Sequence, residues 1–473
     1  MNSILRLLSF IALLTSALHA ASPPNFVVIF IDDMGYGDIG PFGSKINRTP
    51  NLDRMAEEGR TLTSFYVAAP VCTPSRAALM TGCYPRRVGL GQGSGHVVLF
   101  PGDAHALNPD EITVAEVLKG AGYATGCFGK WHLGDQPGFL PTDQGFDRYF
   151  GIPYSNDMWP GHTGWSFPRL PILEGREVVD EVKTMDDQGT LCRRFTDAAT
   201  AFIREHRDEP FFVYLPHAYV HHPRQAAPAF MEAAKGDVTQ AQIEEVDWSV
   251  GQVLDTLREL GLAENTLVLF TSDNGGTKGN VNAPLRGGKG SAFEGGLREP
   301  TVVWWPGTIP AGSRSDEILT SMDVMPTFAH LAGAEAPTDR ILDGQDIAPV
   351  LLGKAGAKSP HDAFFYHQGN TLRAVRSGPW KLFVTGELYH LDSDIGESKN
   401  VAGEHPDIVA RLKQKLTEFE AEITTHSRPV GKTHATRTLL PRPGVEGDEG
   451  YRPTLELGAN KPKKKKAGPA PQK

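Results

Sequence analysis

Cysteine is scarce in this chain of 473 residues, which has four, at positions 72, 83, 127 and 192. No two of them form a Cys-x-x-Cys pair, so the sequence does not predict a structural zinc site. Apolar runs of membrane length are also lacking near the N-terminus, where the run at residues 7–14 is far shorter than the roughly 20 residues that cross a bilayer. We therefore expect no membrane anchor.

Positive charge is scarce outside the C-terminal end. Six of the 47 basic residues are lysines within residues 461–473, and the other 41 face 56 acidic residues, which gives the remainder a net charge of −15. So acidic a body argues against nucleic acid as a partner. A local cluster of cationic side chains must therefore hold any anionic substrate.

The N-terminus has the pattern of an export signal. Arg6 precedes the apolar run, and small residues follow at Ala17, Ala20 and Ala21. A basic start, a short apolar centre and small residues at the end are typical of a secretory signal peptide. We assign residues 1–20 to this signal and expect an exported protein in the periplasm, the extracellular space or another secretory compartment.

Three apolar runs, each followed by metal-binding or catalytic residue types, indicate the fold class. Residues 25–31, 211–215 and 267–272 are rich in β-branched and aromatic side chains, which is typical of strands covered on both faces of a sheet. Helical spacing of apolar residues at 243–260 predicts a helix between strands. The sequence predicts an α/β domain whose site lies at the carboxyl ends of these strands.

The C-terminal part has a different sequence pattern. Four short runs separated by glycine-containing turn signals predict an antiparallel sheet, and a helix is expected after them; the runs are 363–367, 372–376, 381–384 and 387–391, and the helix is 406–423. We place a domain boundary at 353–360. The expected organisation is a catalytic domain at 21–355, a small α+β domain at 356–425 and an extended, disordered, lysine-rich tail at 426–473.

Cys72 is the first candidate for chemistry. Pro74 fixes the backbone just after it, and the apolar run from Ala77 predicts the first turns of a buried helix. A thiol beside a helix N-terminus and beside Arg76 is expected to have a lowered pKa and to be nucleophilic. An ordinary buried cysteine is the alternative.

Oxygen ligands follow two of the predicted strands. Asp32 and Asp33 come directly after residues 25–31, and Asp273 and Asn274 come after residues 267–272. Three carboxylates and an amide oxygen favour Ca²⁺ or Mg²⁺ over zinc or copper. A turn or a helix cap is the alternative explanation of an Asp-Asp pair.

Three strings carry a resemblance to a known family. Residues 70–82 include Cys-Thr-Pro-Ser-Arg-Ala-Ala-Leu-Met-Thr-Gly, residues 122–134 include Gly-Lys-Trp-His-Leu-Gly, and residues 287–300 include Gly-Gly-Lys-Gly. Together they resemble the type I, formylglycine-dependent sulfatases, and most of all the arylsulfatase A-like members, over about residues 25–391. The resemblance implies an alkaline-phosphatase-like sandwich with a large, mostly parallel mixed sheet and a small C-terminal domain with an antiparallel sheet. Phe128 departs from the second string, and we expect it to alter packing without changing the chemistry.

The resemblance also implies roles for individual residues. A maturation enzyme converts Cys72 to formylglycine, whose hydrate attacks sulfur with one hydroxyl and expels sulfate with the other. One Ca²⁺, with Mg²⁺ as the alternative, is bound by Asp32, Asp33, Asp273, Asn274 and residue 72. The catalytic positions are Cys72, Arg76, Lys130, His132, His221 and Lys289. His221 is the expected proton donor, with His217 and His222 as rivals, and Glu294 with Arg298 is expected to form a structural pair.

Other functions are weighed against this one. A phosphonate or phosphodiester hydrolase with the same aldehyde is the nearest rival, and a non-catalytic binder of sulfated glycans is another. A zinc alkaline phosphatase needs further ligands, for which the sequence has no spare cluster of His and Asp. We expect a small sulfated sugar or an aryl sulfate as substrate, in a pocket walled by residues 91–105, residues 155–162 and the C-terminal domain. Pairing among Cys83, Cys127 and Cys192 is left open.

Overall fold

The computed structural model describes residues 23–434, 437–441 and 444. The predicted signal peptide and the lysine-rich end at 461–473 lie outside these residues. Within them, none of the helices is both long enough and apolar enough to cross a membrane. All four cysteines are buried and free.

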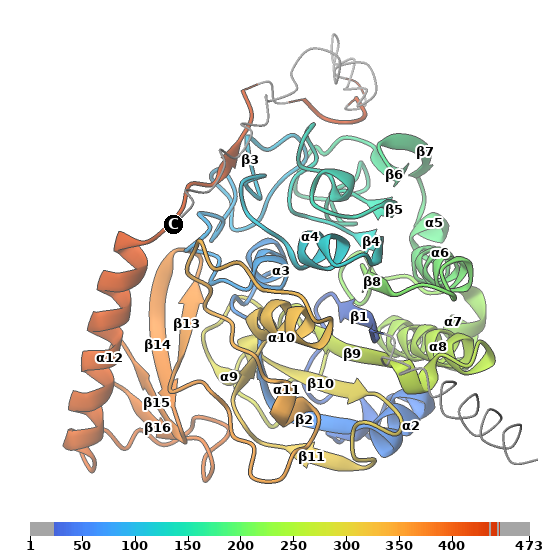
Figure 1. Cartoon of the computed structure of the whole chain (residues 1–473). Coiled ribbons are helices and arrows are strands. Elements are labelled where there is room, and N and C mark those ends of the chain that lie inside the picture. The colour runs from blue at the N-terminus through green and yellow to red at the C-terminus, as the bar shows by residue number, and fades with distance from the viewer. Residues whose placement is uncertain (1–22, 435–436, 442–443, 445–473) are drawn as a thin grey trace, which may run out of the picture.

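A large mixed sheet runs through the middle of the described structure (Figure 1). It has 11 strands among the described residues, in the order β11-β2-β10-β9-β1-β8-β4-β5-β6-β7, with β12 paired to β2. The five strands from β9 to β5 are mutually parallel, while β10, β6 and β7 pair antiparallel. The bounds are β1 Asn25–Ile31, β2 Arg60–Tyr66, β4 Ala124–Lys130, β5 Arg148–Ile152, β6 Leu170–Glu174, β7 Glu177–Val182, β8 Phe211–Pro216, β9 Thr266–Ser272, β10 Arg298–Trp304, β11 Ser313–Ser315 and β12 Leu319–Thr320.

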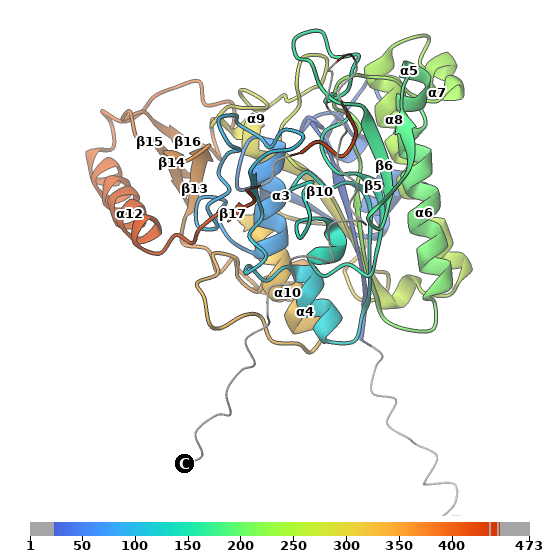
Figure 2. The same ribbon diagram turned by 90° about the horizontal axis from the view of Figure 1, so that it is seen from above.

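Helices cover both faces of this sheet, which explains why its central strands are apolar throughout. Figure 2 shows α6 and α8 on one side and α3, α4 and α10 on the other. Every residue of β1 and of β9 is buried, as expected for parallel strands between two helical layers. The longer helices are α2 Pro50–Glu58, α3 Cys72–Thr81, α4 Val114–Gly120, α6 Leu191–Glu205, α8 Val238–Glu259 and α10 Val324–Leu331. The predicted α/β sandwich is confirmed.

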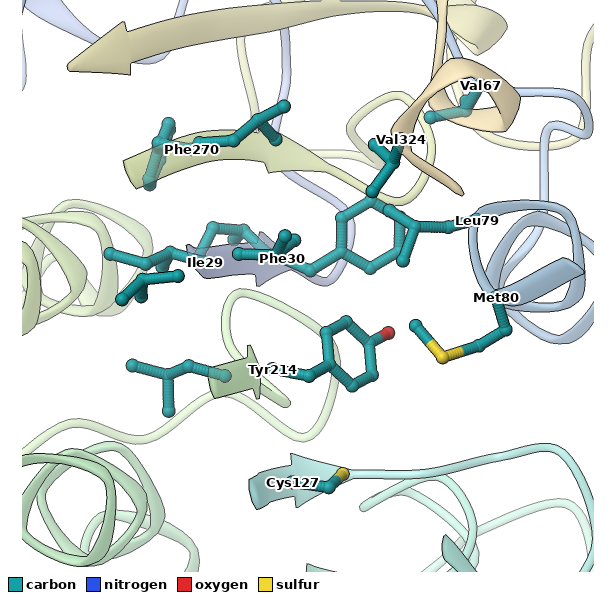
Figure 3. Packing of buried hydrophobic residues seen from close by; sticks show 14 of the residues in the cluster. Ile29, Phe30, Val67, Leu79, Met80, Cys127, Tyr214, Phe270 and Val324 are labelled. Atoms are coloured by element: carbon teal, nitrogen blue, oxygen red, sulfur yellow. The ribbon is translucent and has the colours of Figure 1, made fainter. Parts of the chain in front are cut away.

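The core beneath the site is formed by β1, β8 and α3. Figure 3 shows the rings of Phe30 and Tyr214, from neighbouring strands, facing Leu79 and Met80 of α3. All four side chains are fully buried. Burial of each such side chain contributes roughly 1.5–3 kcal/mol, so this packing fixes α3 firmly against the sheet.

Helix α3 begins earlier than the sequence indicated. The apolar run placed its first turns at Ala77, but the helix starts at Cys72, and all ten of its residues are buried. It ends where Gly82 takes the left-handed conformation, with φ of 67°. Cys72 is therefore the first residue of a buried helix, directed at the carboxyl end of the central strands.

The C-terminal part forms a second, antiparallel sheet packed on one helix (Figure 1). All four predicted strands and the helix are present, with ends within two residues of prediction; they are β13 Phe364–Gln368, β14 Thr371–Ser377, β15 Trp380–Phe383, β16 Leu388–His390 and α12 Pro406–Thr425. No helix or strand of the described chain occupies residues 352–363, between α11 and β13, where the boundary is predicted. The shorter elements are β3 His105–Ala106, α5 Met185–Gln188, α7 Pro228–Ala233, α9 Glu294–Leu297, α11 Ala348–Leu351 and β17 Gly431–Lys432, and the 3₁₀ turns Gly40–Phe42, Pro141–Asp143, Ala263–Asn265 and Ser321–Asp323.

The prediction of a disordered tail from residue 426 is wrong for its first part. Strand β17 pairs antiparallel with β3, and the Arg428 side chain binds Glu111 at 2.7 Å. Leu439 is 2% exposed. Proline and polar residues gave this segment no periodic signal, yet it gains backbone hydrogen bonds from a strand edge that the sequence did not reveal. We call residues 427–441, in their described part, the strap.

Candidate active site

The ends of β1 and β9 bring four oxygen-bearing side chains together. The register of these parallel strands pairs Ile31 with Ser272, so the residues that follow each strand emerge side by side. Asp32, Asp33, Asp273 and Asn274 are all 0% exposed. Asp33 has φ of 66°, a conformation that costs a non-glycine residue of order 1–3 kcal/mol and is concentrated at functional sites.

This quartet has the chemistry of a cation site. Carboxylate oxygens of Asp32, Asp33 and Asp273 lie within 4.8 Å of one another. Asn274 donates its Nδ2 to Asp33 at 2.7 Å, which leaves its Oδ1 buried without a donor, as is Oδ1 of Asp32. Burial and the adjacent Asp32 carboxylate raise the pKa of Asp273. Buried oxygen atoms that lack hydrogen-bond donors, within a cluster of carboxylates, suit a hard divalent cation.

Three cationic side chains surround the quartet. Arg76 contacts Asp273 at 2.8 Å and Asp32 at 3.4 Å, and Lys130 pairs with Asp32. Lys289 lies 2.7 Å from Asp33. Burial alone raises the pKa of Asp32, but Lys130, His221 and Arg76 outweigh it and hold that pKa well below the usual value. The side chains that the sequence selected as anion ligands therefore converge.

Cys72 lies beside these groups but does not have the expected acidity. Local chemistry predicted a lowered pKa, whereas burial raises the pKa of its thiol to about 11 in spite of Lys130 and Lys289. The thiol is 2% exposed, and the negative charges of Asp32 and Asp273 add to the cost of a thiolate. The expectation of a lowered pKa is wrong because it counted the helix N-terminus and Arg76 but could not see burial.

His132 is held in one tautomer. Its Nε2 lies 2.9 Å from the carbonyl of Leu99, which can only accept, so Nε2 carries the hydrogen. Its Nδ1 is buried and has no partner. Burial and the adjacent Lys130 hold the pKa of His132 well below its usual value, so the ring is neutral with a free lone pair on Nδ1. This is the state that a proton acceptor requires.

The three histidines after β8 separate clearly. His221 lines the pocket beside Cys72, and its Nε2 lies 3.7 Å from Asp33. His217 binds Ser249 of α8 at 2.9 Å, and burial lowers its pKa to about 3. The backbone carbonyl of His222 accepts from Nδ1 of His221 at 2.7 Å. Of the three, only His221 lines the pocket in the described structure.

A pocket of about 200 Å³ opens over these residues. The predicted walls 91–105 and 155–162 both contribute to it, but among the described residues the C-terminal domain contributes none of the lining. The lining consists of Val71, Cys72, Val97, Val98, Phe100, His132, Ser155, Asp157, Met158, His162, Trp165, Phe167, His221 and Lys289. The predicted wall at 155–162 includes two polar residues that no sequence pattern distinguishes: Ser155, whose Oγ accepts from Lys130 at 3.0 Å, and Asp157. Trp165 and Phe167 lie outside every predicted wall.

The expected pair of Glu294 and Arg298 belongs to a larger buried network. Their closest atoms are 3.4 Å apart, while Tyr66 and Tyr366 donate to Glu294 at 2.5 and 2.6 Å. Lys381 of β15 contacts the same carboxylate at 3.0 Å. The network therefore joins the C-terminal sheet to the segment that follows Lys289. Phe128 packs against Phe202 of α6, with ring centroids 5.4 Å apart.

The sequence matches two family models. The Sulfatase model matches residues 24–334, more than half of the chain, and the model described as N-sulphoglucosamine sulphohydrolase, C-terminal, matches residues 288–422. The chain belongs to the sulfatase family. The predicted family is thereby confirmed, and this sulfatase is a sulfuric ester hydrolase.

The names of this sulfatase's relatives indicate different substrates. Arylsulfatase A of Homo sapiens is 37% identical over 86% of this chain and 89% of its own length. N-acetylgalactosamine-6-sulfatase of Sus scrofa is 39% identical over 81% of this chain and 77% of its own. The solved structure of Ps i-CgsB in complex with k-i-k-neocarrahexaose is 29% identical, with a TM-score of 0.76 over 88% of this chain and 96% of that one. The fold is thus that of the sulfatases, as the resemblance implied.

Proposed function

We propose that this sulfatase releases inorganic sulfate from a sulfate monoester of a small sugar or a phenol, with formylglycine made from Cys72 as its nucleophile. The observation that carries this proposal is the convergence of the buried quartet, Arg76, Lys130 and Lys289 around residue 72 at a pocket. An anionic ester group placed there meets cationic side chains on several sides. Preorganised charge of this kind usually contributes more to catalysis than any other single effect.

Residue 72 and the quartet would hold the two groups that the reaction needs. The string from Cys72 to Arg76 resembles the one that the maturation enzyme of the family modifies, and the hydrated aldehyde at residue 72 would supply one hydroxyl for attack on sulfur and a second for the release of sulfate. Asp32, Asp33, Asp273 and Asn274 would bind the cation. We propose Ca²⁺, with Mg²⁺ as the alternative, because a cluster of carboxylates with one amide suits the flexible shell of calcium better than the strict octahedron of magnesium.

The chain's own side chains divide the remaining work. Lys130 and Lys289 neutralise the charge on the ester oxygens, and Arg76 orients Asp273 and Asp32. His221 gives a proton to the leaving oxygen from Nε2, the ring nitrogen that is not bound to the backbone carbonyl. His132 accepts a proton at Nδ1, since its Nε2 is occupied by Leu99.

The size of the pocket favours a terminal sulfate. Its volume of about 200 Å³ is below the roughly 300–1,000 Å³ of sites for drug-sized ligands, so it suits one ring. Both the N-acetylgalactosamine-6-sulfatase and the structure in complex with k-i-k-neocarrahexaose support a sugar as the natural substrate. We propose an exported exo-acting enzyme for which aryl sulfates serve as surrogates.

The test compares aryl sulfate with aryl phosphodiester. The enzyme should release phenol from 4-nitrophenyl sulfate far faster than from bis(4-nitrophenyl) phosphate, and Cys72→Ala should abolish both activities while leaving the circular dichroism spectrum unchanged. Faster turnover of the diester would establish the rival phosphodiesterase, and no turnover of either would contradict the proposal. A series of small sulfated sugars should also lose sulfate faster than an intact sulfated polysaccharide.

A further inference from the structure

The pocket is lined by two chemically different sets of residues. Close to residue 72, Lys130 and Lys289 are already paired with Asp32 and Asp33 around the proposed sulfate position. Among the other described residues that line the pocket, apolar and aromatic groups predominate. Asp157 has the only carboxylate among the described lining residues.

Asp157 has an unused hydrogen-bond acceptor. Its Oδ1 is buried and has no partner, while Ser155 hydrogen-bonds to the carboxylate. A buried acceptor without a donor costs of order 1–3 kcal/mol, so a rotation of the carboxylate that brings Oδ1 to a ligand hydroxyl in the pocket would be favoured. Burial raises the pKa of Asp157, but His221, the bond from Ser155 and Lys130 outweigh burial and hold that pKa below its usual value. The group is therefore a carboxylate that accepts and does not donate.

An aromatic wall, which we define as Phe100, Trp165 and Phe167, stands at the same pocket. The ring centroid of Phe100 lies 5.3 Å from that of Trp165 and 5.2 Å from that of Phe167, in edge-on contacts. Trp165 is 54% exposed, although tryptophan in a folded chain is highly buried on average. An exposed ring at the same pocket as a carboxylate can contact the apolar C–H face of a sugar while the carboxylate accepts from one of its hydroxyls.

We infer that Asp157 and the aromatic wall form a subsite for the sugar that carries the sulfate, and that this subsite selects a neutral sugar with a free hydroxyl beside the ester. Asp157 accepts a hydrogen bond from this hydroxyl. Its negative charge disfavours sugars that carry a second sulfate or a carboxylate at the position of the hydroxyl. This inference rests on the proposed function and narrows its substrate class to monosulfated neutral sugars. No covalent bond to Asp157 is made or broken in the reaction, so Asp157 determines specificity and takes no part in the chemistry.

The test uses Asp157→Asn, with Asp186→Asn as the matched control, because Asp186 is exposed and lies outside the pocket lining. The substrates are 4-nitrophenyl sulfate, the best of a panel of monosulfated hexoses, and the disulfated counterpart of that hexose. In Asp157→Asn, the ratio of kcat/KM on the monosulfated hexose to kcat/KM on the aryl sulfate should fall about tenfold, because the neutral amide oxygen of asparagine accepts a weaker hydrogen bond from the hydroxyl than a carboxylate does. The disulfated hexose should improve relative to the monosulfated one, and the control should keep both wild-type ratios.

Calorimetry makes the test independent of turnover. The Cys72→Ala chain, which should not turn over its substrate, should bind the monosulfated hexose more tightly than inorganic sulfate in calcium buffer, and adding Asp157→Asn should weaken that preference about tenfold while leaving sulfate affinity within about twofold. Absence of any turnover by the wild type, with this binding difference intact, would refute the proposed hydrolysis and not the subsite. Equal losses on the aryl and sugar substrates would instead show that Asp157 acts through His221, and unchanged ratios would show that it contacts no sugar; either result overturns the inference.

Discussion

Nζ of Lys381 lies 3.0 Å from Oε1 of Glu294, and both side chains are fully buried. The same ammonium group lies 2.7 Å from Glu397, whose carboxylate accepts from the backbone N–H of Glu294. Glu294 is the first residue of α9 and follows Lys289 closely in the chain. The C-terminal sheet therefore supplies the positive charge that holds the segment bearing one of the site's lysines.

Replacing Lys381 by methionine should destabilise the fold strongly. Two buried carboxylates would lose their main cationic partner, and breaking a buried ion pair costs about 3–5 kcal/mol. The control is Lys399→Met, because the pair of Lys399 with Glu404 is exposed, and such pairs contribute about 0–1 kcal/mol. Urea unfolding at pH 7 measures both. Equal midpoints for the two variants would show that the buried network does not stabilise the chain.

Glu245 offers a pH-dependent prediction. It is 0% exposed, its Oε1 has no partner, and burial raises its pKa to about 7 from 4.5. Because the folded-state pKa is raised, the folded state holds the proton more tightly, and stability is lost as the pH rises from about 4.5 through 7. Glu245→Gln should therefore stabilise the chain by about 3 kcal/mol at pH 8 and have little effect at pH 4.5.

Thermal unfolding of wild type and Glu245→Gln across this range measures the effect. The bond from the N–H of Ala227 to Glu245 is available to a glutamine oxygen as well, so the substitution keeps it. A gain that is the same at every pH would mean that the charge of Glu245 is not responsible.

The sequence could predict those features that show a periodic pattern or a short contiguous motif. The run that became β1 and the pair Asp32 and Asp33 after it are local patterns, so both the strand and the cluster could be placed without coordinates. Asp157 and Trp165 lie in loops that have no period, and only folding brings them to the pocket. The thiol pKa of Cys72 depends on burial by residues distant in sequence, so local chemistry gave the wrong sign.

Modification of Cys72 is expected in active protein. The string from Cys72 to Arg76 should be recognised before folding is complete, because all ten residues of α3 are buried in the folded chain. Peptide mass spectrometry of protein produced with the maturation enzyme should find the aldehyde at residue 72, and protein produced without that enzyme should keep the thiol and lack activity. Full activity of a preparation that contains only thiol would contradict the proposed nucleophile.

Removal of the cation should abolish turnover, and addition of calcium should restore it. The quartet leaves the Oδ1 atoms of Asp32 and Asn274 buried and unpaired, and a cation bound there would satisfy both. Chelation followed by dialysis should lower the unfolding temperature as well as activity, and calcium should recover both better than magnesium. Metal analysis should give calcium in a one-to-one ratio; stoichiometric zinc, or full activity after exhaustive chelation, would refute this assignment.

The strap is expected to support catalysis, because it contacts the loops that position His132. Thr433 donates its N–H to the carbonyl of Ala104 at 2.9 Å, and the side chain of Gln136 donates to the carbonyl of Arg437 at 2.6 Å. Ala104 and Leu99 belong to the loop at residues 82–104, and Gln136 and His132 belong to the loop at residues 131–140. The carbonyl of Leu99 joins the two loops by holding Nε2 of His132. Deleting residues 426–473 should release these loops and lower kcat on 4-nitrophenyl sulfate by at least about tenfold, since small displacements of catalytic groups are costly. Deleting 445–473 is the control and should leave kcat within about twofold, because none of the described contacts of these loops uses those residues. If deleting 445–473 already lowers kcat as much as deleting 426–473, the lysine-rich end, and not the strap, supports catalysis.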